Sequence, residues 1–321
     1  MMIGLDEIVK AQSRIAGQIR RTPLVSSRGL SARYGFPIHL KLESHQSTGS
    51  FKLRGATNAV LLADDEARQR GLVTASTGNH GRAVAQAAAA QGVRAVVCMS
   101  ALVPSNKIDA VQALGADVRI VGRSQDDAQQ EVERLVTGEG LTEIPPFDDA
   151  AVIAGQGTIG LEIIEDCPNV ELVLVPLSGG GLASGIAAAI KGKLPRTRVI
   201  GISMARGAAM HESLRAGHPV AVEELETLAD SLGGGIGLSN RYTFAMCRDL
   251  LDDVVLLSED EIAEGIRHAF TEEETVEGAG AVGIAALLAK KIEVRGPTVV
   301  LVSGRNIDEA RHGQIIAGGH G

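Results

Sequence analysis

Short apolar segments alternate with helical patterns along most of the chain, and this alternation restricts the possible folds more than any other feature. The apolar segments are typical of buried strands and cover residues 39–42, 72–75, 95–99, 118–121, 172–176, 199–203, 254–257 and 298–302. Helical patterns lie at residues 5–20, 82–90, 105–114, 125–136 and 183–190. Apolar strands separated by helices indicate parallel sheets that are covered by helices on both faces. The sequence therefore predicts an α/β fold with two parallel sheets.

The length and charge of the chain exclude several classes of protein. Its 321 residues suffice for two modest domains or one large domain. The net charge of -8 argues against a nucleic-acid surface, and no apolar run reaches membrane-spanning length. Cys98, Cys167 and Cys247 lie in or beside apolar runs without metal-ligand spacing, which predicts buried free thiols in a reducing compartment. Because the N-terminus lacks a signal-peptide pattern, we expect a cytoplasmic protein.

Lys52 lies at a position where a lysine that is simply exposed to solvent would be unfavourable. Residues 41–56 form a turn rich in glycine and hydroxyl groups that runs into apolar residues at helical spacing, so Lys52 lies in the first turn of a predicted helix. The positive end of the helix dipole disfavours a cation there. The dipole and burial together favour the neutral amine, which can attack an aldehyde. By chemistry alone, an exposed lysine that follows a turn explains the same residues equally well.

A glycine run, residues 178–182, follows one predicted strand and precedes a helix. Its glycines let the backbone approach an anion, and the helix start supplies free N–H groups, so phosphate is the expected ligand. A tight turn without a ligand is one alternative. A dinucleotide site is another, because glycines at 179, 181 and 185 resemble its fingerprint. That site needs an acid after the next strand, where Ser203 stands.

Two further loops also follow predicted strands. Residues 76–81 bring hydroxyl, amide and backbone donors to a helix start, which suits a carboxylate. A helix cap without a ligand is the alternative, and His80 alone would more often be structural. Residues 303–308 follow the last predicted strand. Ligands of open parallel sheets bind beyond the carboxyl ends of the strands, so these loops, residues 178–182 and Lys52 form one candidate site.

The stretch 41–56 resembles the lysine segment of the serine/threonine dehydratase and serine racemase family, which consists of pyridoxal-phosphate enzymes of fold type II. The resemblance spans almost the whole chain, from residue 5 to Ser303. It implies that Lys52 forms a Schiff base with pyridoxal 5'-phosphate and that Phe51 lies against the pyridine ring. It also implies that the glycine run binds the phosphate. The cofactor-binding residues implied are Phe51, Lys52, Asn79, Ser178, Gly179, Gly180, Gly181, Leu182 and Ser303.

The resemblance also assigns roles to the loop after the strand at 72–75. Ser76, Thr77, Gly78, Asn79 and His80 match the family loop that grips the substrate α-carboxylate, and Asn79 in addition contacts the phenolic oxygen of the cofactor. Thr77 stands where serine racemases have a serine that acts as second acid/base and where threonine dehydratases have alanine. Thr77 is therefore a candidate catalytic residue beside Lys52.

Three other positions extend this comparison with the family. Ser303 matches a serine at the pyridine nitrogen, where a neutral hydroxyl suits β-elimination. Arg305 replaces a family glycine, and a substrate contact is the one role that we assign to it from the sequence. Residues 201–209 contain no acid, although serine racemases bind a divalent cation there. A hard cation needs oxygen ligands, so we expect no metal site.

The resemblance implies a dehydratase, or ammonia-lyase, that converts a β-hydroxy amino acid to a 2-oxo acid and ammonia. The motifs look most like hydroxyectoine-utilization dehydratases, which are thought to act on a hydroxylated diaminobutyrate derivative. Threonine, serine and 3-hydroxyaspartate remain alternative substrates, and serine racemisation is an alternative reaction. A nicotinamide-dependent oxidoreductase and an inactive binding protein are the rival classes.

The family also implies an arrangement of domains. We expect a large cofactor-binding domain formed by residues 1–61 and 148–321, and a small domain formed by residues 62–147. The cofactor is expected to lie between these two domains, and the protein is expected to be a homodimer.

Overall fold

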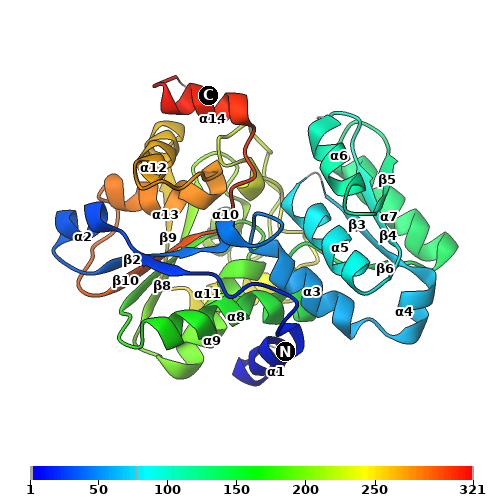
Figure 1. Cartoon of the computed structure of the whole chain (residues 1–321), viewed down its shortest axis with the longest axis horizontal. Coiled ribbons are helices and arrows are strands. Elements are labelled where there is room, and N and C mark those ends of the chain that lie inside the picture. The colour runs from blue at the N-terminus through cyan, green and yellow to red at the C-terminus, as the bar shows by residue number, and fades with distance from the viewer. Residues whose placement is uncertain (1–2, 77, 104, 320–321) are drawn as a thin grey trace.

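A computed structural model describes residues 3–76, 78–103 and 105–319. The chain forms two lobes, each built around one sheet, and helix α3 lies between them (Figure 1). The helices are α1 Leu5–Ile15, α2 Arg28–Tyr34, α3 Lys52–Leu62, α4 Asp65–Arg70, α5 Asn79–Ala90, α6 Ser105–Gln112, α7 Gln125–Glu139, α8 Ala150–Asp166, α9 Gly181–Lys193, α10 Ala209–Ala216, α11 Thr243–Leu250, α12 Glu259–Thr271, α13 Gly278–Leu288 and α14 Glu309–Ile316, with 3-10 turns η1 Glu43–His45 and η2 Asp230–Leu232. The strands are β1 Leu24–Ser26, β2 Ile38–Leu42, β3 Leu72–Ala75, β4 Ala95–Met99, β5 Asp117–Ile120, β6 Thr142–Glu143, β7 Leu172–Pro176, β8 Arg198–Met204, β9 Asp253–Leu257 and β10 Thr298–Val302.

The larger sheet has six strands in the order β1-β2-β10-β7-β8-β9. All neighbouring strands are parallel except β1, which pairs antiparallel with β2. Strand β10 lies between β2 and β7, and Val302 is paired with Leu42. The carboxyl ends of β2 and β10 therefore lie side by side, and the loops that follow them start from the same edge of the sheet.

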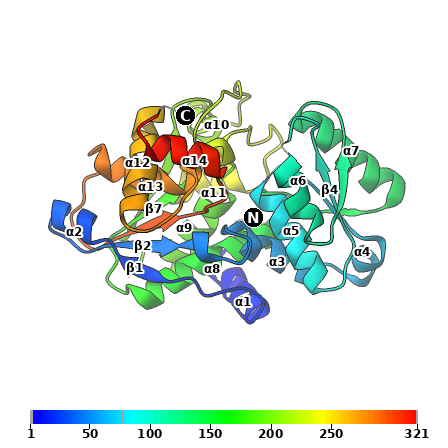
Figure 2. The same cartoon turned by 45° about the horizontal axis from the view of Figure 1, so that its top comes forward.

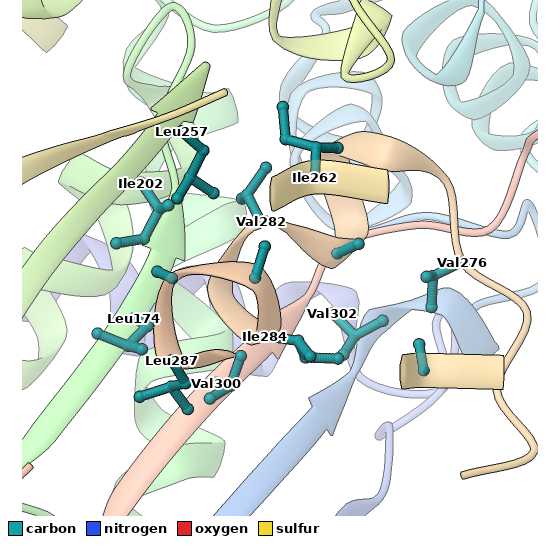
Figure 3. Packing of buried hydrophobic residues seen from close by; sticks show 14 of the residues in the cluster. Leu174, Ile202, Leu257, Ile262, Val276, Val282, Ile284, Leu287, Val300 and Val302 are labelled. Carbon is teal, nitrogen blue, oxygen red and sulfur yellow. The ribbon is translucent and has the colours of Figure 1, made fainter. Parts of the chain in front are cut away.

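Alternating side chains of the larger sheet enter two different cores. Leu172 and Leu174 of β7 pack with α12 and α13, whereas Val173 and Val175 pack with α8 and α9. Figure 3 shows α13 lying on the first face, with Ile284 and Leu287 close to β10. This alternation follows from the strand period of two and explains why the strands are apolar on both faces.

The smaller sheet has four parallel strands in the order β5-β4-β3-β6. Val97 of β4 packs toward α3 and α5, and its neighbour Val96 packs toward α7. Helix α3 contacts α5 on the side of this sheet and α8 on the side of the larger one, as the turned view also shows (Figure 2). Residues at the start of α3 therefore lie where the two sheets face each other.

The predicted α/β fold with two sheets is confirmed, with differences at single elements. The helix predicted at 5–20 ends at Ile15, because Ala16, with a ψ of 131°, and Gly17, with a φ of 76°, form a turn in which the Gln18 N–H donates to the Ile15 carbonyl oxygen at 3.0 Å. The strand predicted at 118–121 begins and ends one residue earlier. Strands β1 and β6 were not predicted, since they are short and carry exposed positions. The proposed domain boundaries stay a prediction.

Among the helices of the described residues, none is both long and apolar enough to cross a bilayer.

Candidate active site

Lys52 is the first residue of α3, as the sequence predicted. Its Nζ donates a hydrogen bond to the carbonyl oxygen of Pro146 at 2.6 Å and lies 5.3 Å from the centre of the Phe51 ring. Burial lowers the pKa of Lys52 to about 8, against the opposing charge of Glu277. The backbone N–H of Phe51 donates to the carbonyl oxygen of Ser303 at 3.0 Å, which joins the start of α3 to the end of β10.

The glycine run, residues 178–182, connects β7 to α9. Among the described residues, none accepts a hydrogen bond from the backbone N–H groups of this run. Gly180 has a φ of 92°, and a Cβ on Gly179 would lie 2.4 Å from the ring of Phe147. Glycine is therefore required here by backbone conformation and by contact with the residue that follows Pro146. Consecutive free N–H groups at a helix start fit a phosphate.

The loop before α5 is open on one side. Ser76 Oγ accepts hydrogen bonds from the N–H groups of Gly78 and Gly81 at 3.3 and 3.0 Å. A Cβ built on Gly78 would meet no described atom within 4 Å, so there is room for a ligand beside it. Thr77 lies outside the described residues, and its predicted catalytic and substrate-binding roles stay predictions.

His80 is buried and faces the backbone. Its Nε2 lies 2.9 Å from the carbonyl oxygen of Ile144, so this nitrogen carries the proton and Nδ1 is an acceptor. Among the described residues Nδ1 has no partner. Burial lowers the pKa of His80 to about 3, and the charge of Lys52 acts in the same direction. His80 is therefore neutral at physiological pH.

Asn79 joins this loop to the larger lobe. Its Nδ2 donates to Glu277 Oε1 at 2.8 Å, and its Oδ1 accepts from Asn306 Nδ2 at 2.6 Å. Asn306 Oδ1 in turn accepts from Arg82 at 3.1 Å. These contacts bring the end of β3 and the end of β10 together, as the sequence predicted for the loops that carry Asn79 and Ser303.

Glu277 is the main site residue that the sequence analysis missed. It precedes α13, is 4% exposed, and its side chain gives no helix cap. Burial raises the pKa of Glu277 to about 7, Asp230 adds to the rise, and the hydrogen bond from Asn79 opposes it. The sequence could have pointed to Glu277 only as an acid directly before the apolar run 278–288. Its contact with Asn79 arises only in the fold.

Ser303 follows β10 and is buried. Its Oγ donates to the carbonyl oxygen of Ala279 at 3.3 Å. The next residue, Gly304, has no room for a side chain, because a Cβ would lie 2.5 Å from Glu277 Oε1. Arg305 is exposed, and it lines a cavity of about 280 Å³ together with Arg82 and other residues.

Arg54, one half-turn beyond Lys52, belongs to a separate buried ion cluster. Its guanidinium donates to both carboxylate oxygens of Glu43, at 2.9 and 2.7 Å, and to both of Glu162, at 2.6 and 2.9 Å. Lys41 Nζ also contacts Glu162 at 2.6 Å. Burial alone would lower the pKa of Arg54, but the two carboxylates outweigh it and raise the pKa. The cluster ties α3 to β2 and α8.

The glycines of the suspected dinucleotide fingerprint have a structural explanation. A Cβ on Gly185 would lie 2.4 Å from the carbonyl oxygen of Ile153 in α8, so this glycine serves helix packing. Ser203, where an acid was needed, is buried against Met204. Within residues 3–76, 78–103 and 105–319, no three His, Cys, Asp or Glu side chains gather as metal ligands.

Comparisons with known proteins agree with this geometry. The family described as pyridoxal-phosphate dependent enzyme matches residues 15–304. A Sinorhizobium fredii protein, provisionally named a threonine dehydratase, is 59% identical over 98% of this chain and 96% of its own length. The L-threonine ammonia-lyase of Thermotoga maritima is 43% identical over 96% of this chain and 76% of its own length. The structure of maize serine racemase superposes with a TM-score of 0.92 at 32% identity, covering 99% of this chain and 98% of that one.

The chain therefore belongs to the pyridoxal-phosphate-dependent enzymes of fold type II. Within that class it is a lyase that resembles threonine dehydratases. Pyridoxal phosphate is its cofactor. The alternative of a nicotinamide-dependent oxidoreductase is therefore not supported.

Proposed function

We propose that this enzyme is a dehydratase that releases ammonia from a small β-hydroxy amino acid, with L-threonine as the first substrate to test. The observation that carries the proposal is Lys52, whose amine has a pKa lowered to about 8 and donates to Pro146, the residue before the Phe147 that lies against the glycine run. The neutral His80 is near enough for the charge of Lys52 to act on its pKa. The names of the two relatives, threonine dehydratase and threonine ammonia-lyase, support the choice of substrate.

Each part of the site has a role in this proposal. Bound pyridoxal phosphate supplies an electron sink that weakens the bonds at the substrate α-carbon. The N–H groups of residues 178–182 would hold its phosphate, Phe51 would pack on its ring and Ser303 would bind the ring nitrogen. Lys52 holds the cofactor and then takes the α-proton on Nζ, which its lowered pKa favours because a near-neutral amine is an effective base.

The substrate carboxylate binds at the start of α5. The open space beside Gly78 and the N–H groups of the first helical turn suit an anion. We propose Ser76, Thr77, Gly78, Asn79 and His80 as its ligands. His80 takes part through its backbone N–H, because its ring is neutral and its single ring N–H is donated to the carbonyl oxygen of Ile144.

The particular substrate is the finer part of the proposal. A hydroxylated diaminobutyrate derivative of hydroxyectoine breakdown remains one candidate, on the sequence motifs alone. Serine and 3-hydroxyaspartate are others. The likeness to maize serine racemase favours one test of a second reaction, the racemisation of serine.

The test is ammonia and 2-oxo acid release by the purified, cofactor-loaded enzyme over a panel of these amino acids. L-Threonine is expected to give the highest kcat/KM, and chiral analysis of residual serine is expected to show little inversion. Turnover of the diaminobutyrate derivative at a kcat/KM tenfold above that of threonine would transfer the assignment to it. A panel without any ammonia release would contradict the proposed function.

We also propose that the enzyme is a cytoplasmic homodimer with the domain boundaries given above. The reduced state expected for its buried cysteines and the family resemblance support this. Sedimentation equilibrium tests the dimer, since a single species with the mass of one chain would contradict it.

A further inference from the structure

The first turn of α3, which carries Lys52, lacks one of its usual hydrogen bonds. The carbonyl oxygen of Phe51 accepts from the N–H of Arg54 at 3.0 Å, three residues on, and not from the N–H of Gly55, four residues on. This one bond spans three residues although Lys52–Leu62 is α-helical, and Phe51 adds no side-chain cap. This leaves the buried Gly55 N–H in need of an acceptor from outside its own helix.

Gln156 of α8 supplies that acceptor. Its Oε1 accepts from the Gly55 N–H at 3.2 Å, and its side chain is 1% exposed. The other end of the same amide, Nε2, is buried without a partner among the described residues. A buried amide with an unpaired donor is unfavourable, so the glutamine is held here for its acceptor oxygen, without which the buried Gly55 N–H would have no partner outside its helix.

The two helices approach closely where this bond is made. A Cβ on Gly155 would lie 2.6 Å from the Cα of Gly55, and a Cβ on Gly55 would lie 2.4 Å from Gln156 Nε2. The backbone of α3 is thus held against α8 within one turn of Lys52. The Lys52 side chain leaves this turn and reaches the Pro146 carbonyl at 2.6 Å.

We propose that Gln156 is a positioning residue for Lys52. Its Oε1 holds the Gly55 N–H in the first turn of α3 and so fixes the direction in which the Lys52 side chain leaves the helix. Without this acceptor, the Gly55 N–H turns to the Phe51 carbonyl, the first turn shifts, and the amine moves. The inference rests on the proposed role of Lys52 as the cofactor lysine.

The test compares variants of nearly equal volume in the cofactor-free protein. Gln156→Met removes the acceptor, whereas Gln156→Glu, protonated in this apolar setting, keeps a carbonyl. The readout is the rate at which Lys52 captures added pyridoxal phosphate, followed by borohydride reduction and mass spectrometry. Amide exchange of residues 52–56 and the melting temperature are measured on the same samples.

A matched control comes from the next turn of α3. Asn58 Nδ2 donates to the carbonyl oxygen of Ala151 in α8 at 2.7 Å, so Asn58→Leu removes another bond between the same two helices. We expect capture to slow about tenfold or more in Gln156→Met, because small displacements of a reacting group have effects of that size. Gln156→Glu is expected within threefold of wild type and Asn58→Leu within twofold.

Each outcome decides the inference. Wild-type capture in Gln156→Met, or an equal loss in Asn58→Leu, would overturn it. If Gln156→Met does not fold, Gln156→Ala replaces it, and an Ala variant as fast as Gln156→Glu would also overturn the inference. Capture needs no substrate, so the result stands even if the panel above rejects threonine.

Discussion

Helix α3 carries two cations, the fully buried Arg54 and the half-buried Lys52, and their surroundings differ. Arg54 donates to both oxygens of two carboxylates, whereas Lys52 donates to one backbone carbonyl. Burial acts on both to lower the pKa. For Arg54 the carboxylates reverse this effect, and for Lys52 the pKa falls to about 8. A buried group with a full countercharge stays charged. A buried group without one has a pKa that moves toward neutrality, so it can exchange its proton near neutral pH.

The acids of the two clusters differ in the same way. Burial opposes ionisation of Glu162, but Arg54 and Lys41 outweigh it and the pKa is lowered. Glu277 has amide and backbone partners nearby, and burial raises its pKa to about 7. Arg54 and Glu162 therefore keep their charges at neutral pH, whereas Lys52 and Glu277 have pKa values close enough to neutrality to change theirs.

Replacing Lys52, the cation that can exchange its proton, should have the largest effect on activity. We expect Lys52→Ala to lower turnover about 1000-fold or more, since it removes both the cofactor lysine and the proposed base. The melting temperature should not fall, because a buried amine without a full countercharge is removed. Steady-state kinetics and circular dichroism check this. Lys191→Ala, a half-buried lysine paired with Asp252, is the control and should keep full activity. Normal turnover in Lys52→Ala would reject the assignment.

Replacing Arg54, the cation that keeps its charge, should mainly lower the stability of the fold. Arg54→Met leaves Glu43 and Glu162 buried with one cation fewer, and we expect a loss of about 3–5 kcal/mol in the free energy of unfolding. Urea unfolding measures it. Arg21 also contacts two acids, but at the surface, so Arg21→Met should lose at most about 1 kcal/mol. Equal losses in the two variants would remove the distinction between the clusters.

The raised pKa of Glu277 predicts a pH effect with a definite sign. Its folded pKa of about 7 lies above the ordinary value of 4.5, so the folded protein holds this proton more tightly. The stabilisation is complete below pH 4.5 and is lost as the pH rises through 7. The stability of Glu277→Gln relative to wild type should therefore rise between these pH values. Unfolding of the cofactor-free protein in urea checks this, and a flat difference would show that Glu277 is ionised throughout.

Removal of divalent cations should have the smallest effect on activity. Residues 201–209 offer no carboxylate to a hard cation, so a chelator should leave activity within about twofold of the untreated enzyme. The assay is ammonia release before and after dialysis against the chelator. Loss of activity that magnesium or calcium restores would show that the enzyme needs a bound divalent cation.

The sequence predicted the parts of the site that depend on local pattern. Lys52 at a helix start, the glycine run after β7 and the loop before α5 all combine a strand end, glycines and a helix start within a few residues. Partners that are distant in the chain were not predicted. Arg54 meets Glu162 across 108 positions, and Asn79 meets Glu277 across 198. A single sequence carries no record of such pairs, because each residue, seen alone in the sequence, resembles an ordinary polar surface residue.

The place of β10 has a consequence for synthesis on the ribosome. This strand is the last of those described, yet it lies between β2 and β7, and it brings the Ser303 carbonyl to Phe51. A nascent chain that has reached residue 290 therefore has open edges on two apolar strands and no completed lysine turn. Long-range strand pairing of this kind is slow and exposes edges that aggregate. The enzyme therefore acquires its active site only after residue 303 has been made, and until then the strand edges that β10 covers stay unpaired.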